Sequence, residues 1–470
     1  SDGMGRSVSS IGDFNNDGID DVIVGRSGND YGRAVIIYGN AYQYDNPLNI
    51  NQITGGNGFI LKGNPVMGMS VSSAGDFNGD GIDDLIVASR FYANVSVEDA
   101  VAYILFGNTS PMLQTVDLTQ ISPTEGVKIN KPITDDAGNY KVSNAGDFNG
   151  DGFDDIMVSA YDSDMEATLA GNTYVIYGDN SLASHVIELD DINGTNGINI
   201  IGGELYDLSG IFLASAGDFN GDSFDDILIT TEGAQDDYKG HVYLLFGSDN
   251  PAHPFALSNT NGSNGVKFTG ESDFAFAGYG VAGNFDFNAD GLDDIIIGSY
   301  GAKPYSYYDA GKAYVIYGTD AVLTSPFSVD AIDGSNGTEI RGLNPKGRFG
   351  KSVSGIGDFN GDHIDDIIVG APASDVRGWG AVFYGKTSPP AIIDAWPLFK
   401  EDGFRIQSSG NYLNRFGDAV SSAGDFNNDG LADVIIGSWS EDVGLEDAAG
   451  RAYILYGNDT IFQSQFEGDL

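Results

Sequence analysis

The chain has 470 residues, of which 41% are hydrophobic, and its formal net charge at pH 7 is −46. So acidic a surface repels nucleic acid and anionic lipid, which excludes both as partners, and it attracts cations. The chain has no cysteine, which excludes disulfides, thiolate metal sites and a cysteine nucleophile. A eukaryotic extracellular protein of this size would usually carry disulfides, so their absence favours a bacterial source. No apolar run approaches the ~20 residues of a membrane helix, which argues against membrane insertion.

A nine-residue acidic phrase returns seven times along the chain, roughly once every 63 to 72 residues. The first copy is Asp13-Phe14-Asn15-Asn16-Asp17-Gly18-Ile19-Asp20-Asp21. Later copies start at Asp76, Asp147, Asp218, Asp286, Asp358 and Asp425. A fixed period of this size indicates repeated supersecondary units within one architecture.

Each repeat reads as four short strands in chain order, most clearly in the sixth. Residues 349–354 alternate and precede the acidic loop, residues 367–370 form an apolar β-branched run, and residues 381–385 and 403–406 supply two more strands. Four strands per period and no sustained helical periodicity predict an all-β, seven-bladed β-propeller of four-stranded antiparallel blades. The predicted blades of this single domain are residues 1–62, 63–130, 131–202, 203–270, 271–342, 343–407 and 408–470.

The fourth strand occurs only six times, ending at Leu61, Ile129, Ile200, Phe268, Ile340 and Ile406. Ser1 begins where a seventh such strand would have ended, and Leu470 stops short of one. We therefore expect the chain to be a fragment whose ring lacks one strand at the termini.

The acidic loop carries the side chains of a calcium site. Numbered from its first residue, Asp stands at positions 1, 5 and 9 and Asn at position 3 in all seven copies, while position 7 is apolar. Ca²⁺ takes six to eight oxygen ligands, which these side chains and the backbone carbonyl of position 7 would supply. About seven sites follow, one per blade. The predicted ligands are Asp13, Asn15, Asp17, Ile19, Asp21; Asp76, Asn78, Asp80, Ile82, Asp84; Asp147, Asn149, Asp151, Phe153, Asp155; Asp218, Asn220, Asp222, Phe224, Asp226; Asp286, Asn288, Asp290, Leu292, Asp294; Asp358, Asn360, Asp362, Ile364, Asp366; and Asp425, Asn427, Asp429, Leu431, Asp433.

Differences between the copies refine the assignment. Position 8 is Asp in six copies and Ala432 in the seventh, so we expect it to have an indirect or solvent role. We expect the position 7 side chain to point into the core. Position 6 is Gly except at Ser223 and His363, where a positive φ would cost on the order of 1 kcal/mol and weaken those two sites. The fifth copy reads as if Asn284 and Phe285 were inserted before Asp286, which would shift that loop's entry.

The acidic loop has three other interpretations besides the calcium site described above. An EF-hand needs a bidentate acid at position 12, which is apolar here, and flanking helices, so it is rejected. A metal-free, Asx-rich turn would not need so many like charges. Mg²⁺ is the lesser alternative to Ca²⁺, since it prefers rigid octahedral shells with retained water.

The repeats resemble those of the FG-GAP repeat family, whose best-known members are integrin alpha subunit head domains. The sixth repeat holds both halves of the motif, Phe349-Gly350 and Gly370-Ala371-Pro372, on either side of the acidic loop. The resemblance covers nearly the whole chain. It implies a seven-bladed propeller with Ca²⁺ loops on one face and ligand-binding loops on the other. Integrin alpha propellers usually keep such loops in only some blades, and no integrin beta-like partner is identifiable here.

For function, we expect an extracellular or cell-surface binding and adhesion module for a protein or carbohydrate ligand. The candidate ligand face is Tyr300, Tyr305, Tyr307, Tyr308 and Trp439. One alternative is a calcium-rigidified spacer of a surface protein, and another is a propeller attached to a hydrolase or lyase. We do not expect an enzyme, because the four histidines have no zinc spacing and no nucleophile motif appears.

Overall fold

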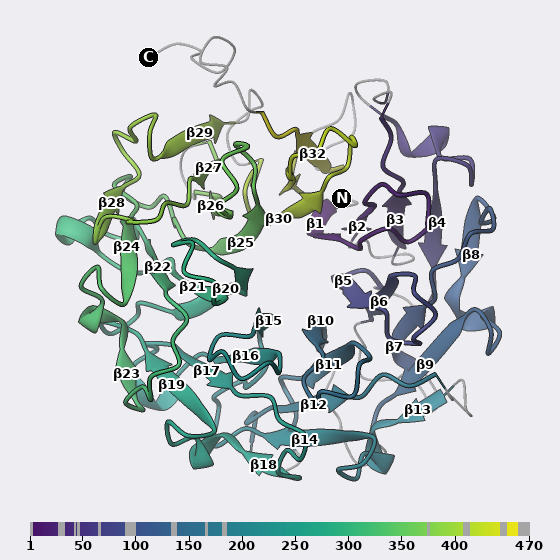
Figure 1. The fold of residues 1–470 in the computed structure, drawn as a ribbon, viewed down its shortest axis with the longest axis horizontal. Coiled ribbons are helices and arrows are strands. Elements are labelled where there is room, and N and C mark those ends of the chain that lie inside the picture. Colours follow the sequence, from purple (N-terminus) through teal and green to yellow (C-terminus); the bar gives the residue numbers. More distant parts are fainter. Residues whose placement is uncertain are drawn as a thin grey trace.

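The computed structural model describes residues 3–26, 33–41, 44, 48–63, 67–89, 100–132, 139–164, 168–180, 186–373, 377–407, 414–441 and 449–458. Seven sheets stand around a central axis like the blades of a propeller (Figure 1). No α-helix occurs in the described part of the chain. The prediction of an all-β, seven-bladed propeller is therefore confirmed.

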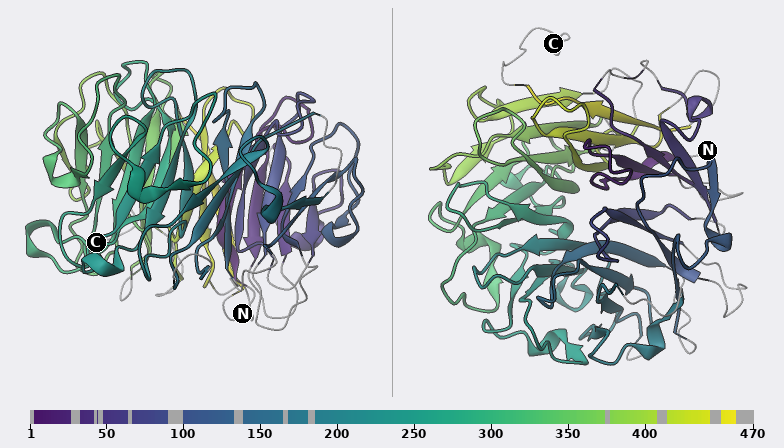
Figure 2. Two further views of the ribbon diagram at one scale, coloured as in Figure 1. Left: turned by 90° about the horizontal axis from the view of Figure 1, so that it is seen from below. Right: turned by 45° about the vertical axis from the view of Figure 1, so that its right-hand side comes forward.

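Within a blade, successive strands run antiparallel from the axis outward (Figures 1 and 2). The innermost strands are β1 (Met4–Ser10), β5 (Ser70–Gly75), β10 (Tyr140–Gly146), β15 (Leu213–Gly217), β20 (Ala277–Phe285), β25 (Ser352–Gly357) and β30 (Ala419–Gly424). The second strands are β2 (Val22–Arg26), β6 (Asp84–Ala88), β11 (Asp155–Ala160), β16 (Asp226–Thr231), β21 (Asp294–Ser299), β26 (Asp366–Ala371) and β31 (Asp433–Ser438). The second strands are buried on both faces, which fits their apolar β-branched sequences.

The outer strands complete each blade. The third strands are β3 (Arg33–Ile37), β7 (Ala100–Leu105), β12 (Asn172–Ile176), β17 (His241–Leu245), β22 (Lys312–Ile316), β27 (Trp379–Phe383) and β32 (Arg451–Leu455). The fourth strands are β4 (Gly58–Lys62), β9 (Gly126–Asn130), β14 (Gly197–Ile201), β19 (Gly265–Thr269), β24 (Gly337–Arg341) and β29 (Gly403–Gln407). The seventh sheet has three strands within the described residues, and residues 459–470 lie outside them.

Five blades differ from the expected four-stranded form, because a short strand from the next repeat adds in parallel to their outer edge. These strands are β8 (Thr115–Asp117) on β4, β13 (Val186–Glu188) on β9, β18 (Phe255–Ala256) on β14, β23 (Phe327–Ser328) on β19 and β28 (Ile392–Asp394) on β24. The added strand covers an otherwise unpaired sheet edge and ties neighbouring blades together. Short 3₁₀ helices complete the connections: η1 (Ile50–Gln52), η2 (Leu118–Gln120), η3 (Leu189–Asp191), η4 (Ala234–Asp236), η5 (Leu257–Asn259), η6 (Pro304–Ser306) and η7 (Val329–Ala331).

The core is divided into seven clusters, each formed by two adjacent blades. One of them packs Val8 and Val24 of the first blade against Phe426 and Ile435 of the seventh, and so closes the ring. Backbones also meet at this junction, where a Cβ added to Gly437 would lie 2.0 Å from the carbonyl oxygen of Gly5. Gly370, in the second half of the motif, makes the same approach, since a Cβ there would lie 2.2 Å from the Gly417 carbonyl oxygen of the next blade. Glycine at these positions therefore permits close approach between blades.

Candidate functional site

Each acidic loop joins an innermost strand to a second strand, so all seven loops lie on one face of the ring. The position 1 carboxylate accepts hydrogen bonds from the backbone N–H groups of positions 5 and 6, at 2.7–3.1 Å in every loop. The position 5 carboxylate accepts the N–H of position 7 at 3.0–3.1 Å. Each loop is thus wrapped around its first aspartate. In the sixth loop Asp358 Oδ1 accepts a second N–H, from Gly361 at 2.7 Å.

Position 6 adopts a left-handed backbone conformation in all seven loops. Its φ is 85° to 91° at the five glycines, 74° at Ser223 and 68° at His363. A Cβ added at any of those five glycines meets no atom within 4 Å, so the cost of a side chain there comes from the backbone conformation alone.

Position 9 holds a fully buried carboxylate in every loop. Its Oδ1 accepts the N–H of the glycine that follows the third strand, for example Gly39 bound to Asp21 at 2.8 Å. The buried Oδ2 of Asp21, Asp155, Asp226 and Asp433 has no hydrogen-bond partner. Burial raises the pKa of Asp21, Asp84, Asp155, Asp226, Asp294 and Asp366 to about 8 and that of Asp433 to about 7, although the glycine N–H opposes this. An unpartnered buried carboxylate oxygen is costly unless a proton or a cation satisfies it.

The donor set fits a cation that prefers oxygen. Besides the position 9 oxygens, the Oδ1 atoms of Asn15 and Asn427 at position 3 are buried without a partner. Across the described ranges, no three His, Cys, Asp or Glu side chains converge at metal-binding distance. Each predicted set contains three aspartates, so the carboxylates of positions 1, 5 and 9 do not converge at metal-binding distance in this conformation. The other two predicted ligands are an amide oxygen and a backbone carbonyl.

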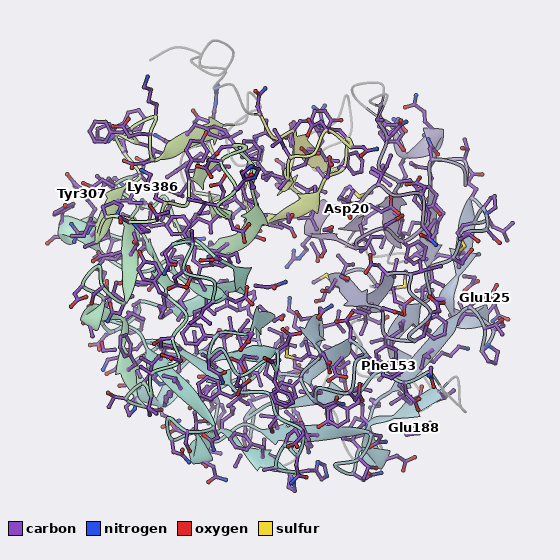
Figure 3. All side chains as sticks on the ribbon, viewed as in Figure 1. Asp20, Glu125, Phe153, Glu188, Tyr307 and Lys386 are labelled. Carbon is purple, nitrogen blue, oxygen red and sulfur yellow. The ribbon has the colours of Figure 1, made fainter. Side chains whose placement is uncertain are left out.

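Position 8 links the loops into a nearly closed ring. Its carboxylate accepts the backbone N–H of position 1 in the preceding blade, at 2.7–3.0 Å in six of the seven junctions. At the closing junction Asp425 donates to Asp20, which lies beside β1 and β30 (Figure 3). At the remaining junction Ala432 offers no acceptor to Asp358, and Ala432 N–H donates to the Asp358 carbonyl at 3.0 Å. Of the two roles expected for position 8, the solvent role is wrong for six loops, because the carboxylate there joins two blades. Its bond to the backbone of position 1, itself a predicted ligand, fits the indirect role.

Two further expectations about the loops are corrected. The position 7 side chains are half-buried rather than in the core, and a Cβ on Gly79 would meet the ring of Phe153 from the next blade at 2.2 Å. They pack between loops, while the position 2 phenylalanines, from Phe14 to Phe426, fill the core.

The fifth copy contains no insertion. Phe285 pairs with Asp294 as Gly357 pairs with Asp366, so Asn284 and Phe285 replace the usual residues at the strand end. The entry of that loop is unchanged, since Asp290 and Gly291 donate to Asp286 as in the other copies.

The candidate ligand face lies at the opposite ends of the strands. Tyr305, Tyr307 and Tyr308 are 61%, 44% and 61% exposed, in the loop between β21 and β22, and Figure 3 shows Tyr307 on the outer rim. Tyr300 is half-buried and stacks on Phe276 with ring centres 5.1 Å apart. Trp439 is half-buried near the axis. Of the five predicted residues, Tyr305, Tyr307 and Tyr308 are therefore exposed as a ligand face requires, whereas Tyr300 and Trp439 are half-buried.

Sequence reasoning missed four exposed apolar residues on this face, Leu205, Tyr206, Tyr238 and Phe274. Tyr238 stacks on Phe274 with centres 5.9 Å apart, and Phe274 N–H donates to the Asp237 carbonyl at 2.9 Å. The backbone φ is positive at Tyr206, Tyr238, Phe274 and Tyr305. Bulky residues seldom adopt this conformation, and such strain is concentrated at functional sites.

Comparison with known proteins identifies the class. The FG-GAP repeat model matches residues 67–103, 139–176, 211–245, 349–387 and 416–455, so this chain is an integrin alpha-like FG-GAP β-propeller. It is 27% identical over 238 residues to integrin alpha-5 of Xenopus laevis, covering 50% of this chain and 20% of that protein. It is 30% identical over 250 residues to integrin alpha pat-2 of Caenorhabditis elegans, covering 50% and 18%.

A second kind of relative bears the name of an enzyme. The chain is 30% identical over 161 residues to phosphatidylinositol-glycan-specific phospholipase D of Rattus norvegicus, covering 34% of this chain and 18% of that protein. The chain spans a fifth or less of the length of each of these relatives. Among the described residues, no helix is long and apolar enough to cross a membrane.

Proposed function

We propose that this chain is a calcium-binding propeller that acts as an extracellular or cell-surface adhesion module. The observation that carries the calcium proposal is the fully buried position 9 carboxylate, whose second oxygen lacks a partner in four loops. Side chains of positions 1, 3, 5 and 9 and the carbonyl of position 7 would hold the ion. Bound Ca²⁺ would supply positive charge that lets the clustered carboxylates stay ionised in the folded state.

Calcium is the better candidate than magnesium. The loops offer amide, carboxylate and carbonyl oxygens on an exposed turn, which suits the flexible, high-coordination shell of Ca²⁺. Mg²⁺ demands a compact octahedron and keeps several waters. Each occupied site would add up to ~2.7 kcal/mol of folding stability when free Ca²⁺ is 100 times its Kd.

The ligand would bind on the face opposite the calcium loops. Exposed aromatic rings from the loops of the fourth and fifth blades support this proposal, since such rings stack on sugars and anchor proteins at interfaces. Similarity to integrin alpha chains supports a protein ligand, and a carbohydrate is the second option. We propose no integrin beta-like partner.

We favour a binding module over an enzyme, because the acidic side chains of the loops are committed to backbone hydrogen bonds and to the proposed cation. Similarity to a phospholipase D also supports a propeller attached to a hydrolase or lyase, in which the propeller itself binds. A calcium-rigidified spacer is the remaining alternative, and it predicts no ligand for the aromatic face.

The test is binding to a glycan array and to a panel of purified extracellular matrix proteins, with Ca²⁺ and with EDTA. We expect a ligand whose binding is lost in a Tyr305→Ser, Tyr308→Ser double variant. The matched control is Leu113→Ser with Val322→Ser, which removes two apolar side chains that are 77% and 83% exposed. They follow β7 and β22 on the calcium-loop face, where Asn108 and Thr319 donate to the carbonyls of Phe14 and Phe219 in the acidic loops. Equal loss in both variants, or no ligand at all, would reject the proposed face.

A further inference from the structure

The innermost strands enclose a cavity of about 290 Å³ at the centre of the ring. Its lining comes from the first halves of these strands, next to the ends of the second strands where the loops of the aromatic face begin. The charged residues of the lining are Arg6, Lys141, Lys351 and Asp418, which are three cations and one carboxylate. Side chains with nitrogen tips reach into this central opening (Figure 3). The lining is therefore basic in a chain whose net charge is −46.

The single carboxylate of the lining is already engaged on both oxygens. Asp418 Oδ1 forms a short ion pair with Lys351 Nζ. Asp418 Oδ2 accepts the indole N–H of Trp439 at 2.5 Å. Lys351 and Asp418 thus neutralise each other, and Asp418 is not available to the other two cations.

Within the described residues, the charged groups of Arg6 and Lys141 lie over aromatic rings. The Arg6 guanidinium lies over the Trp439 ring, 5.3 Å from its centre, and the Lys141 ammonium lies over the Phe212 ring at 5.6 Å. Neither forms an ion pair with any residue in the described part of the chain. Burial, and secondly the charge of Arg6, lower the pKa of Lys141 to about 8. Two cations that repel each other in a partly enclosed space favour an anion between them.

The cavity lining also holds serine hydroxyl groups, and two of them already form hydrogen bonds with neighbouring blades. Ser352, also in the lining, donates its hydroxyl to the Gly417 carbonyl of the next blade at 2.8 Å. Ser70 donates to the Val142 carbonyl at 3.4 Å and accepts the Val142 N–H at 3.2 Å. These serines join blades, so the positive side chains are the groups best placed to meet a ligand.

We propose that the mouth of the central channel is an anion-binding site in which Arg6 and Lys141 hold an oxyanionic group, either of a free small anion or of an acidic residue in a bound protein. Arg6 presents a planar pair of donors that suits a carboxylate or sulfate, and Lys141 supplies a second charge from across the opening. Aromatic contacts run from Phe212 through Tyr279 and Tyr300 to Phe276, which links this mouth to the aromatic face. This site is independent of the calcium loops.

The test titrates sulfate, succinate and a peptide with one aspartate between glycines into the whole chain, at low ionic strength with saturating Ca²⁺. Binding is followed by NMR shifts and by the pKa of Lys141. We expect sulfate or succinate to bind, to be displaced by added NaCl, and to raise the pKa of Lys141 toward its ordinary 10.5. Tighter binding of the peptide than of succinate would identify a protein residue as the source, and equal or weaker binding a free anion.

The variants Arg6→Met and Lys141→Met remove the charge and keep much of the apolar stem. Each should weaken anion binding roughly tenfold or more, as expected for hydrogen bonds to charged groups. Lys62→Met, which removes an exposed pair with Asp117, is the matched control and should bind like the unmodified chain. If no probe changes the Lys141 pKa, or if both channel variants bind as the control does, the proposal fails. The pKa readout does not require the variants to fold, and calcium binding should be unchanged in every arm.

Discussion

At the scale of single residues, the loop positions divide into roles that a consensus does not distinguish. Position 8 differs from position 9 by one step along the chain, yet one carboxylate joins two blades and the other is buried within its own. The substitution at Ala432 alone predicts an indirect or solvent role for position 8. Its partner across the junction, the N–H of Asp358, shows instead that a specific hydrogen bond is missing there.

The inter-blade bond predicts opposite effects at two positions. Asp83→Ala should lower the free energy of unfolding by about 1–3 kcal/mol, because the Asp13 N–H loses its acceptor. Ala432→Asp should raise it by about 1 kcal/mol by completing the ring of such bonds. Urea denaturation with Ca²⁺ present measures both, and Asp249→Ala on the exposed surface is the control. A gain on removing Asp83 would contradict this role.

Position 6 predicts a second, smaller pair of effects. His363→Gly should stabilise the chain by up to about 1 kcal/mol, because φ is 68° there and glycine adopts it without strain. Gly430→Ala should destabilise it by a similar amount, since the added Cβ meets no atom and only the conformation is penalised. Calcium affinity of the sixth loop should rise in the first variant. Melting curves of the two variants that shift in the same direction would argue against the conformational explanation.

At the scale of the loop as an element, the buried carboxyls make the free energy of unfolding depend on pH. We expect bound calcium to reverse the direction of this dependence. Without a cation, burial raises the folded-state pKa of Asp21 and its equivalents to about 8, above the unfolded value near 4. The folded state then holds more protons, so the free energy of unfolding should be greatest below pH 4 and fall as pH rises toward 8. With Ca²⁺ bound the carboxylates are held ionised, and stability should be lost on acidification.

Urea unfolding at pH 5 and pH 8, in EDTA and in Ca²⁺, tests this reversal. We expect the EDTA sample to be more stable at pH 5 and the calcium sample at pH 8. The same direction in both samples would mean that the buried carboxyls do not exchange a proton for the cation.

Strands are the elements that the sequence predicted well, and the connections are those it did not. Apolar runs such as residues 367–370 are long enough and regular enough to identify the second strands. The parallel edge strands, such as Phe255–Ala256, are two or three residues long and gain their stability from the neighbouring blade. No local pattern of that length distinguishes a strand from a loop, so only the packing of repeats reveals them.

The same limit explains the errors within the site. The Asp at position 9 was identified from its recurrence. The place where the position 7 side chain packs depends on the adjacent blade, which the periodicity within one repeat does not describe. Tyr238 and Phe274 meet only because two loops from different strands of the ring come together. Their exposure could not be read from either segment alone.

At the scale of the whole molecule, the acidic loops repeat around the ring and spread its negative charge over one face. Each blade packs on both neighbours, closure brings Val8 against Phe426, and the acidic loops follow one another around a single face. In the absence of cations the loop carboxylates repel each other across the blades. The proposed Ca²⁺ ions would neutralise this repulsion. Stability of the ring should therefore depend on several coupled sites rather than on one.

Calcium binding by the loops is tested most directly by calorimetric titration of the EDTA-treated, dialysed chain with Ca²⁺, together with its melting temperature at each calcium concentration. We predict about seven bound ions per chain, weaker binding in the loops with Ser223 and His363, and a melting temperature that rises strongly as the sites fill. No heat of binding and an unchanged melting temperature would contradict this prediction, because the buried loop carboxylates would then be satisfied without a metal.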